Sequence, residues 1–213
     1  FGEELKKVHT MKLSNFLMVE VKKEEYTLKY CKFVRDFMAS FQDRKWNETS
    51  EKFKMFVKAK SEVIYKLLDD TERLFLKVEH NQEIPVLCHS DIHGGNVLLK
   101  KGADDIYLVD WDEPLIAPKE KDLMFIGGGV GNVWNNKEEQ SFFYKGYGHE
   151  NINRSLLAYY RLDRIVKDLA EYIEILVLNN PELDAKARSQ RYIHFTDMFD
   201  PRGVIEIALN YKR

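Results

Sequence analysis

A short stretch of β-type sequence interrupts a chain whose apolar residues otherwise recur at helical spacing. Residues 96–100 and 106–110 are two apolar runs, and Lys101–Asp105 between them supplies the Gly and Asp residues of a tight turn. Periodic apolar positions predict helices over residues 3–9, 24–41, 51–68, 70–80, 120–126 and 153–179, and a last helix that opens at Pro201. The predicted fold is mainly α with a small β-hairpin.

The bulk composition is that of a globular domain and excludes several classes of function. Apolar residues make up 44% of the 213 residues, charged residues 32%, and the formal net charge is -2. This charge creates no broad basic field that would attract nucleic acid or an anionic membrane. Cys31 and Cys88 form no CxxC pair and are expected to be buried, reduced thiols. Reduced thiols are typical of a cytoplasmic protein, which is what we expect, and no apolar run is long enough to span a bilayer.

The polar segment before the hairpin has the spacing of a kinase catalytic loop. His89 lies two residues before Asp91, and Asn96 follows Asp91 by five positions. In such a loop the Asp accepts the proton of the attacking hydroxyl, and the Asn turns back to bind magnesium through its amide oxygen. The segment 88–99 is therefore the predicted catalytic loop.

A second carboxylate for the same metal ion is expected at the end of the hairpin. Asp110 closes the second apolar run, and a strand pair returns the chain close to its starting point, beside Asn96. Oxygen ligands of this kind suit magnesium. Asp112 is either a further metal-site carboxylate or a turn residue, and we favour a turn or supporting role.

Zinc is the competing interpretation of the same segment. His89 and His93 are four residues apart, which is the spacing of two zinc ligands on a helix. Gly94 and Gly95 argue against a helix, however, the glutamate of an HExxH motif is missing, and Cys88 has no partner cysteine nearby. This alternative predicts stoichiometric zinc in the purified protein.

Three other features resemble functional motifs but have simpler explanations. The glycines of residues 127–131 lack the Lys and Ser/Thr of a phosphate loop and follow a predicted helix, so they are typical of a turn. Lys22 has no glycine-rich loop upstream and is predicted to be a surface residue. Asp197 and Asp200 could face a cationic substrate, and helix capping before Pro201 explains Asp200 equally well.

The combined motifs resemble the aminoglycoside phosphotransferase and choline kinase superfamily. The resemblance rests on His89–Asn96, Leu108–Asp112, Pro118 and Lys121–Leu123, and residues 118–129 are similar to the spectinomycin phosphotransferase-type branch. Ser90 stands where the family usually has Gly. The resemblance implies that residues 1–213 form a protein-kinase-like C-terminal lobe (α+β), with the catalytic loop at 88–99 and a metal-binding hairpin end at 106–112.

The resemblance also implies a role for each matching residue. Asp91 would be the catalytic base and His89 would brace the loop. The magnesium ligands would be Asn96 and Asp110, and the floor of the adenine pocket would be formed by Leu98 and Val109. Asp122 would be a structural aspartate that anchors a helix.

The expected function is an ATP- and magnesium-dependent O-phosphotransferase that acts on the hydroxyl of a small, cationic molecule. An aminoglycoside or aminocyclitol is the first expectation, and choline, homoserine or a sugar are alternatives. The glycine-rich hairpin and ATP-gripping lysine of an N-terminal lobe do not occur in these 213 residues. We therefore expect a lobe of a longer kinase, with little turnover by itself, or a solitary lobe that serves as a binding or regulatory module.

Overall fold

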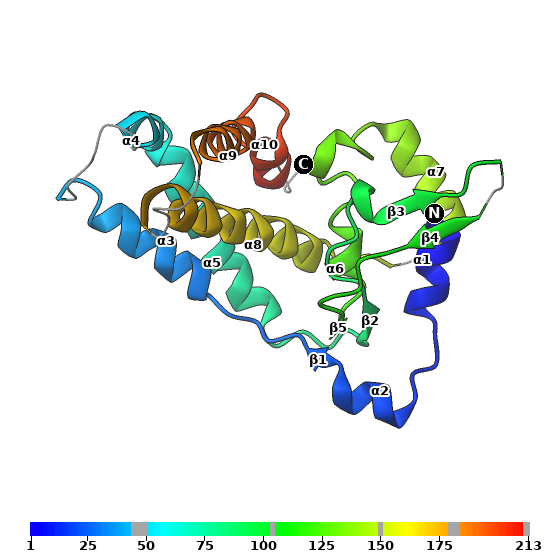
Figure 1. Ribbon diagram of the computed structural model, residues 1–213. Coiled ribbons are helices and arrows are strands. Elements are labelled where there is room, and N and C mark those ends of the chain that lie inside the picture. Colours follow the sequence, from blue (N-terminus) through cyan, green and yellow to red (C-terminus); the bar gives the residue numbers. More distant parts are fainter. Residues whose placement is uncertain (44–50, 103–104, 149–150, 179–183, 211–213) are drawn as a thin grey trace. The chain divides into compact units, whose positions relative to one another are not determined.

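The structure is a computed structural model that describes residues 1–43, 51–102, 105–148, 151–178 and 184–210 (Figure 1). It contains two compact units, the first formed by Phe1–Tyr26 with His80–Tyr160 and the second by Thr27–Glu79 with Arg161–Arg213. The described residues of the second unit form helices and no strands, whereas the first unit combines helices with short strands, among them the predicted hairpin. No helix of the described residues is long and apolar enough to cross a membrane.

The first unit holds two small sheets. The predicted hairpin is confirmed: β3 (Val97–Leu99) pairs antiparallel with β4 (Ile106–Leu108). Its turn includes residues 103–104, which lie outside the described residues. The second sheet has the order β1 (Lys22–Lys23), β5 (Leu115–Ala117) and β2 (Val86–Cys88), with β5 parallel to β1 and antiparallel to β2. The sequence did not predict this sheet, because strands of two or three residues show no alternation.

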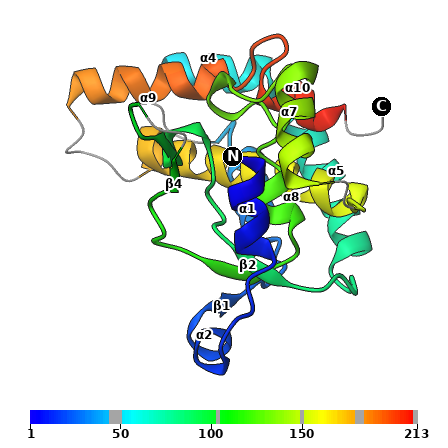
Figure 2. The ribbon, with the colours of Figure 1, turned by 90° about the vertical axis from the view of Figure 1, so that its right-hand side faces the viewer.

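In the first unit, α1 (Gly2–His9) packs along α7 (Lys137–Tyr147) (Figure 2). The two helices approach so closely that a Cβ on Gly2 would lie 2.2 Å from the carbonyl oxygen of Phe143. Buried side chains from both helices meet those of the short helix α6 (Glu120–Leu123) and the residues after it. This core consists of Leu5, Leu123, Ile126, Phe143 and Tyr147. The unit also contains α2 (Asn15–Glu20) and the 3-10 turns η1 (Gly94–Asn96) and η2 (Val130–Asn132).

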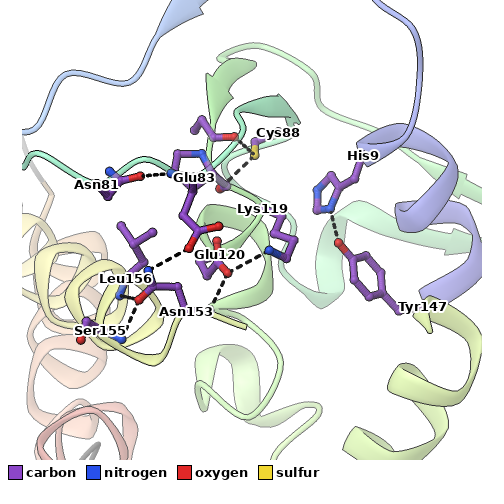
Figure 3. Close-up of polar contacts among 12 residues, drawn as sticks. His9, Asn81, Glu83, Cys88, Lys119, Glu120, Tyr147, Asn153, Ser155 and Leu156 are labelled. Carbon is purple, nitrogen blue, oxygen red and sulfur yellow. Dashed lines mark hydrogen bonds and ion pairs between the residues drawn. The ribbon is translucent and has the colours of Figure 1, made fainter. Parts of the chain in front are cut away.

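A polar network fixes the start of α8 (Arg154–Ile173) (Figure 3). The side-chain oxygen of Asn153 accepts hydrogen bonds from the backbone N–H groups of Ser155 and Leu156, which is an N-cap. The Asn153 amide donates to Glu83 at 3.0 Å, and its backbone N–H donates to Glu120 at 2.9 Å. Lys119 pairs with the fully buried Glu120 at 3.2 Å, so α6 and the start of α8 are connected through charged groups.

The second unit is entirely helical in its described residues. Its elements are α3 (Lys29–Ala39), α4 (Glu51–Ala59), α5 (Ser61–Val78), the remainder of α8, a π-helical turn (Glu174–Leu178), α9 (Ala185–Asp197) and α10 (Val204–Leu209). Aromatic rings from α4 and α9 pack together, with Phe53 and Phe195 at a centroid distance of 4.8 Å.

Several helix boundaries differ from the sequence prediction, and α3 begins at Lys29 instead of residue 24. The predicted break between 68 and 70 is wrong, because α5 runs through it and the break lies at Lys60. Asp70 is tolerated within the helix since Lys66 and Arg73 pair with its carboxylate at 2.7 and 2.6 Å. Burial alone would raise the pKa of Asp70, but these two partners outweigh it and lower that pKa below its usual value. The last helix begins at Val204 instead of Pro201.

Candidate active site

The hairpin brings the ends of the predicted catalytic loop together. The carbonyl oxygen of Asn96 accepts a hydrogen bond from the backbone N–H of Val109 at 3.1 Å. Asn96 directly precedes β3, and Val109 directly follows β4. Asp110 is therefore the neighbour of the residue that pairs with Asn96. The sequence expectation that these two residues lie close together agrees with this register.

Asp91 and Asn96 are connected within the loop. The amide nitrogen of the buried Asn96 side chain donates to the carbonyl oxygen of Asp91 at 2.8 Å. This bond uses the nitrogen and leaves the amide oxygen as the atom with which Asn96 can bind a cation. The side chain of Asp91 is 47% exposed. Its carboxylate is therefore accessible to a substrate from solvent.

His89 connects the loop to the residue before Asp110. Its Nε2 lies 2.8 Å from the carbonyl oxygen of Val109, and its Nδ1 accepts a weak hydrogen bond from the N–H of Asp91 at 3.4 Å. Because a carbonyl can only accept, Nε2 carries the hydrogen. The ring also packs against Trp111, with centroids 4.6 Å apart. His89 thus contacts both segments of the candidate site.

Asp122 holds the backbone at the start of the loop. Its two carboxylate oxygens accept hydrogen bonds from the N–H groups of His89 at 2.8 Å and Ser90 at 2.7 Å. Ser90 has a φ of 71°, a conformation that favours glycine. The hydroxyl of Ser90 donates to the carbonyl oxygen of Glu113 at 2.6 Å, a contact that glycine could not make. The strained backbone therefore sits beside Asp91 and is held on both sides.

Asp110 adopts a similar backbone conformation. Its φ is 68°, and it is exposed after β4. Asp is one of the few residues with a side chain that visits this region readily. Left-handed residues outside glycine concentrate at functional sites, where surrounding contacts hold them in place.

His93 lies beside the predicted base. Its Nδ1 accepts a hydrogen bond from the N–H of Gly95 at 3.0 Å, so the hydrogen of a neutral ring is on Nε2. That atom is 3.8 Å from a carboxylate oxygen of Asp91. The sequence singled out His93 only as a ligand in the zinc alternative, and this geometry makes it a neighbour of the Asp91 carboxylate.

The two residues predicted to line an adenine pocket differ in their surroundings. Leu98 is 49% exposed and lies opposite Tyr107, which is 50% exposed, so the hairpin presents an apolar face to solvent. Val109 is half-buried, and its carbonyl oxygen is the acceptor for His89. An exposed apolar face is compatible with a planar ligand, and the role of both residues stays a prediction.

The glycine-rich segment after α6 forms turns, as the sequence predicted. Gly127, Gly129 and Gly131 all have positive φ, and a Cβ on Gly128 would lie 2.2 Å from the carbonyl oxygen of Met124. The segment leads to Val133, whose side chain would contact a Cβ on Gly94 at 2.9 Å. It therefore lies directly against the candidate catalytic loop.

The donor atoms at the hairpin fit a magnesium ion. Asn96 and Asp110 offer an amide oxygen and a carboxylate, which are hard ligands. The zinc alternative is less well matched, since His89 is bonded to Val109 and packed on Trp111.

Lys22 is exposed in β1, and Asp197 and Asp200 are exposed in the second unit. Asp200 does not cap α10, which has Gly203 as its N-cap.

One other cluster of ligand-type side chains occurs in the part of the chain that the structure describes. His9, Cys88 and Asp122 are buried, with one ligand atom of each within 4.8 Å of the others. Burial raises the pKa of the Cys88 thiol well above its ordinary value, and the thiol donates to the carbonyl oxygens of Ala117 and Pro118. Both oxygens of Asp122 already accept N–H groups of the loop. The polar atoms of the cluster are thus engaged in hydrogen bonds: His9 with Asp122, and the thiol with the two carbonyl oxygens.

Sequence reasoning missed three residues that support the site. His9 bonds directly to Asp122, and Tyr147 bonds to His9. Trp111 packs on His89. Trp111 stood within the quoted motif and could have been found there. His9 and Tyr147 gave no signal, because the contacts join positions more than 100 residues apart.

Comparison with known proteins found a matching family model and similar solved structures. The family model for choline/ethanolamine kinase matches residues 1–114. Among curated proteins, none matches the chain.

Two solved structures are at least 40% identical over nearly the whole chain. Spectinomycin phosphotransferase APH(9)-Ia in complex with ADP and spectinomycin is 41% identical, with a TM-score of 0.91, and the match covers 99% of this chain and 64% of that one. The AMP-bound complex of APH(9)-Ia is 40% identical, with a TM-score of 0.88 and coverage of 100% and 65%. An ethanolamine kinase of Plasmodium vivax shares the fold at 15% identity and a TM-score of 0.54, over 97% of this chain and 59% of that one. The chain thus spans less than two thirds of the length of these structures.

Proposed function

Because this chain belongs to the choline/ethanolamine kinase family, we propose that it carries the phosphoryl-transfer site of an ATP- and magnesium-dependent O-phosphotransferase. The acceptor is the hydroxyl group of a small molecule. The observation that carries this proposal is the loop and hairpin geometry. An accessible Asp91 carboxylate, the buried Asn96 amide and Asp110 lie in one connected segment, joined by the Asn96–Asp91 and Val109–Asn96 hydrogen bonds.

In this reaction Asp91 orients the acceptor hydroxyl and takes its proton as the oxygen bonds to the γ-phosphorus of ATP. The bond between that phosphorus and the bridging oxygen breaks, and ADP leaves. His89 keeps Asp91 and the segment around Val109 in register through its two ring nitrogens. Positioning and electrostatic stabilisation supply most of the catalysis in such transfers.

Asn96 and Asp110 would hold the magnesium ion. When bound, it neutralises charge on the phosphate oxygens. Leu98 and Val109 would support the adenine ring, with Leu98 contributing its exposed side chain. Complexes of APH(9)-Ia with ADP and AMP support nucleotide binding by this fold.

An aminoglycoside or aminocyclitol is the proposed acceptor class. One of the similar structures is a complex with spectinomycin, and its 41% identity extends over 99% of this chain. Choline, homoserine and sugars are the competing acceptors. A panel of these compounds, assayed for ATP-dependent phosphorylation, should give the highest kcat/KM for an aminocyclitol or aminoglycoside.

We also propose that the active enzyme is longer than these 213 residues and that they correspond to its C-terminal lobe. The support is the coverage of 64% and 65% of the two APH(9)-Ia structures. A solitary lobe that acts as a binding or regulatory module is the alternative. Calorimetry with ATP and magnesium and a kinase assay, both on the product of the complete native coding frame, separate the two, since the alternative predicts binding without turnover.

The central test replaces Asp91 with Ala in the full-length protein. Loss of the proton acceptor should lower kcat by at least about a hundredfold, while the fold and the Kd for ATP are retained. Asp105→Ala is the matched control, because Asp105 is an exposed carboxylate in the same hairpin that pairs with Lys100. Equal activity of the Asp91→Ala and Asp105→Ala variants would contradict the assignment.

A further inference from the structure

A chain of buried hydrogen bonds leads from α7 through α1 to the candidate catalytic loop. The hydroxyl of Tyr147 lies 2.7 Å from Nδ1 of His9, as Figure 3 shows, and Nε2 of His9 lies 3.0 Å from a carboxylate oxygen of Asp122. Asp122 in turn accepts the N–H groups of His89 and Ser90. All three side chains are buried, so water does not compete for these contacts.

The donor and acceptor roles in this chain are determined by its chemistry. The Asp122 carboxylate can only accept, and it already accepts two backbone N–H groups, so Nε2 of His9 carries a hydrogen. In a neutral ring Nδ1 then accepts the hydroxyl hydrogen of Tyr147. Each group in the chain thus fixes the next one, and the carboxylate has three donors around it.

This series of hydrogen bonds ends at Ser90, the strained residue beside the proposed base Asp91. Ser90 has a φ of 71°, and such a conformation persists only where surrounding contacts over-determine it. If the Asp122 carboxylate rotated, the N–H groups of His89 and Ser90 would lose their acceptor. The loop could then relax and displace Asp91, which follows Ser90 directly.

We propose that His9 is a positioning residue of the phosphoryl-transfer site. Held by Tyr147, it orients the Asp122 carboxylate, which fixes the backbone of His89 and Ser90 and thereby the place of Asp91. Its effect on turnover rests on the proposed function. Its effect on the loop backbone does not, and can be measured separately.

The test compares His9→Leu with His9→Gln in the full-length protein. Leu removes both hydrogen bonds, whereas the amide nitrogen of Gln reaches the place of Nε2 and can still donate to Asp122. His9→Leu should speed hydrogen exchange at the amides of His89 and Ser90 by about tenfold or more. It should lower kcat by about ten- to a hundredfold with the KM for ATP within about twofold. His9→Gln should restore both values to within about threefold of the parent.

Tyr147→Phe and Tyr160→Phe form the matched pair of outer variants. Both remove a hydroxyl from a buried tyrosine of the same unit. The Tyr160 hydroxyl, however, bonds to Tyr26 and takes no part in the hydrogen bonds that join Tyr147, His9 and Asp122. Tyr147→Phe should reproduce part of the His9→Leu effect on exchange and kcat, and Tyr160→Phe should reproduce none of it.

The outcomes separate the two hypotheses. If His9→Leu lowers thermal stability but leaves exchange at His89 and Ser90 unchanged, His9 has only a packing role and the inference is wrong. If exchange responds as expected while the unsubstituted protein phosphorylates none of the acceptors, the proposed function fails and the positioning of the loop backbone stands.

Discussion

The side chain of Asn96 combines a hydrogen-bond donor with an acceptor, which a carboxylate does not. Its nitrogen donates to the carbonyl oxygen of Asp91, and its oxygen is the proposed metal ligand. An aspartate of the same shape would supply a stronger metal ligand but would turn a carboxylate oxygen towards that carbonyl. The amide is therefore required by the loop even before a metal ion binds.

Asn96→Asp is expected to destabilise the protein by about 1–3 kcal/mol without magnesium, because a buried donor is replaced by an unpaired acceptor. Added magnesium should recover part of this loss, since a cation pairs with the new carboxylate. Thermal unfolding with and without magnesium measures both effects. A variant as stable as the parent in the absence of magnesium would show that the Asn96–Asp91 bond contributes nothing.

Residue identity at the site could be predicted where the motif is local. The spacing of Asp91 and Asn96 and the strand-terminal Asp110 are visible in one segment, and the hairpin register agrees with it. His9 could not be found this way, because its partner Asp122 is 113 positions away and a lone histidine on a short helix has no distinguishing pattern.

At the level of elements, close helix packing depends on two glycines. Gly2 in α1 contacts the backbone of α7, and a Cβ on Gly146 in α7 would lie 3.2 Å from Glu3. Because Gly2 and Gly146 have no Cβ, α1 can approach α7 closely, and this approach places His9 beside Tyr147. The close contact is thus a condition for the hydrogen bonds that reach the loop.

Gly2→Ala should destabilise the protein by about 1–3 kcal/mol, because the added Cβ would lie 2.2 Å from a backbone oxygen that cannot move independently. Ala has the higher intrinsic helix propensity, so an effect of propensity alone would have the opposite sign. Chemical denaturation checks the change, with Lys7→Ala at an exposed position of α1 as the control. A gain in stability for Gly2→Ala would contradict the packing argument.

Element prediction succeeded where the apolar pattern is clear, and it missed the helices α7 and α9 as well as the sheet β1-β5-β2. The apolar spacing of α3 and α8 is visible over several turns, and the hairpin has a Gly/Asp turn. The sheet β1-β5-β2 has strands too short for a periodic signal. The continuity of α5 through Asp70 depends on ion pairs with Lys66 and Arg73, which propensity alone does not reveal.

For the whole molecule, buried acids with raised pKa values make stability depend on pH at the alkaline end. Burial raises the pKa of the Cys31 thiol from 9.0 to about 12. Burial also raises the pKa values of Cys88 and Tyr160. The unfolded chain therefore loses these protons at lower pH than the folded protein, and alkali favours unfolding.

The contribution of Cys31 to folding should be constant below pH 9 and should fall between pH 9 and about 12, by about 1.4 kcal/mol per pH unit. Cys31→Ala should remove this part of the slope, although it lowers stability at neutral pH. Val34→Ala, at a buried position of the same helix, creates a cavity without removing a titrating group and should keep the parent slope. Parallel pH profiles for the two variants would contradict the assigned pKa.

The 213-residue chain alone is expected to bind ATP weakly and to show little turnover, because it spans 64% of the structure that binds ADP and spectinomycin. The transition state of phosphoryl transfer needs stabilising groups around all of the transferred charge. Calorimetry and a coupled ADP assay on this chain measure both quantities. Robust turnover by the chain alone would overturn the proposal that the active enzyme is longer.

The contacts from Tyr147 through His9 and Asp122 to His89 have a consequence for refolding. They join positions separated by 138 and 113 residues, so α1, α6 and α7 must assemble before the loop backbone gains its acceptors. Such non-local contacts form late, because closing long loops costs entropy before the contacts stabilise the chain. After dilution from denaturant, helical circular dichroism should therefore return before the amides of His89 and Ser90 become protected.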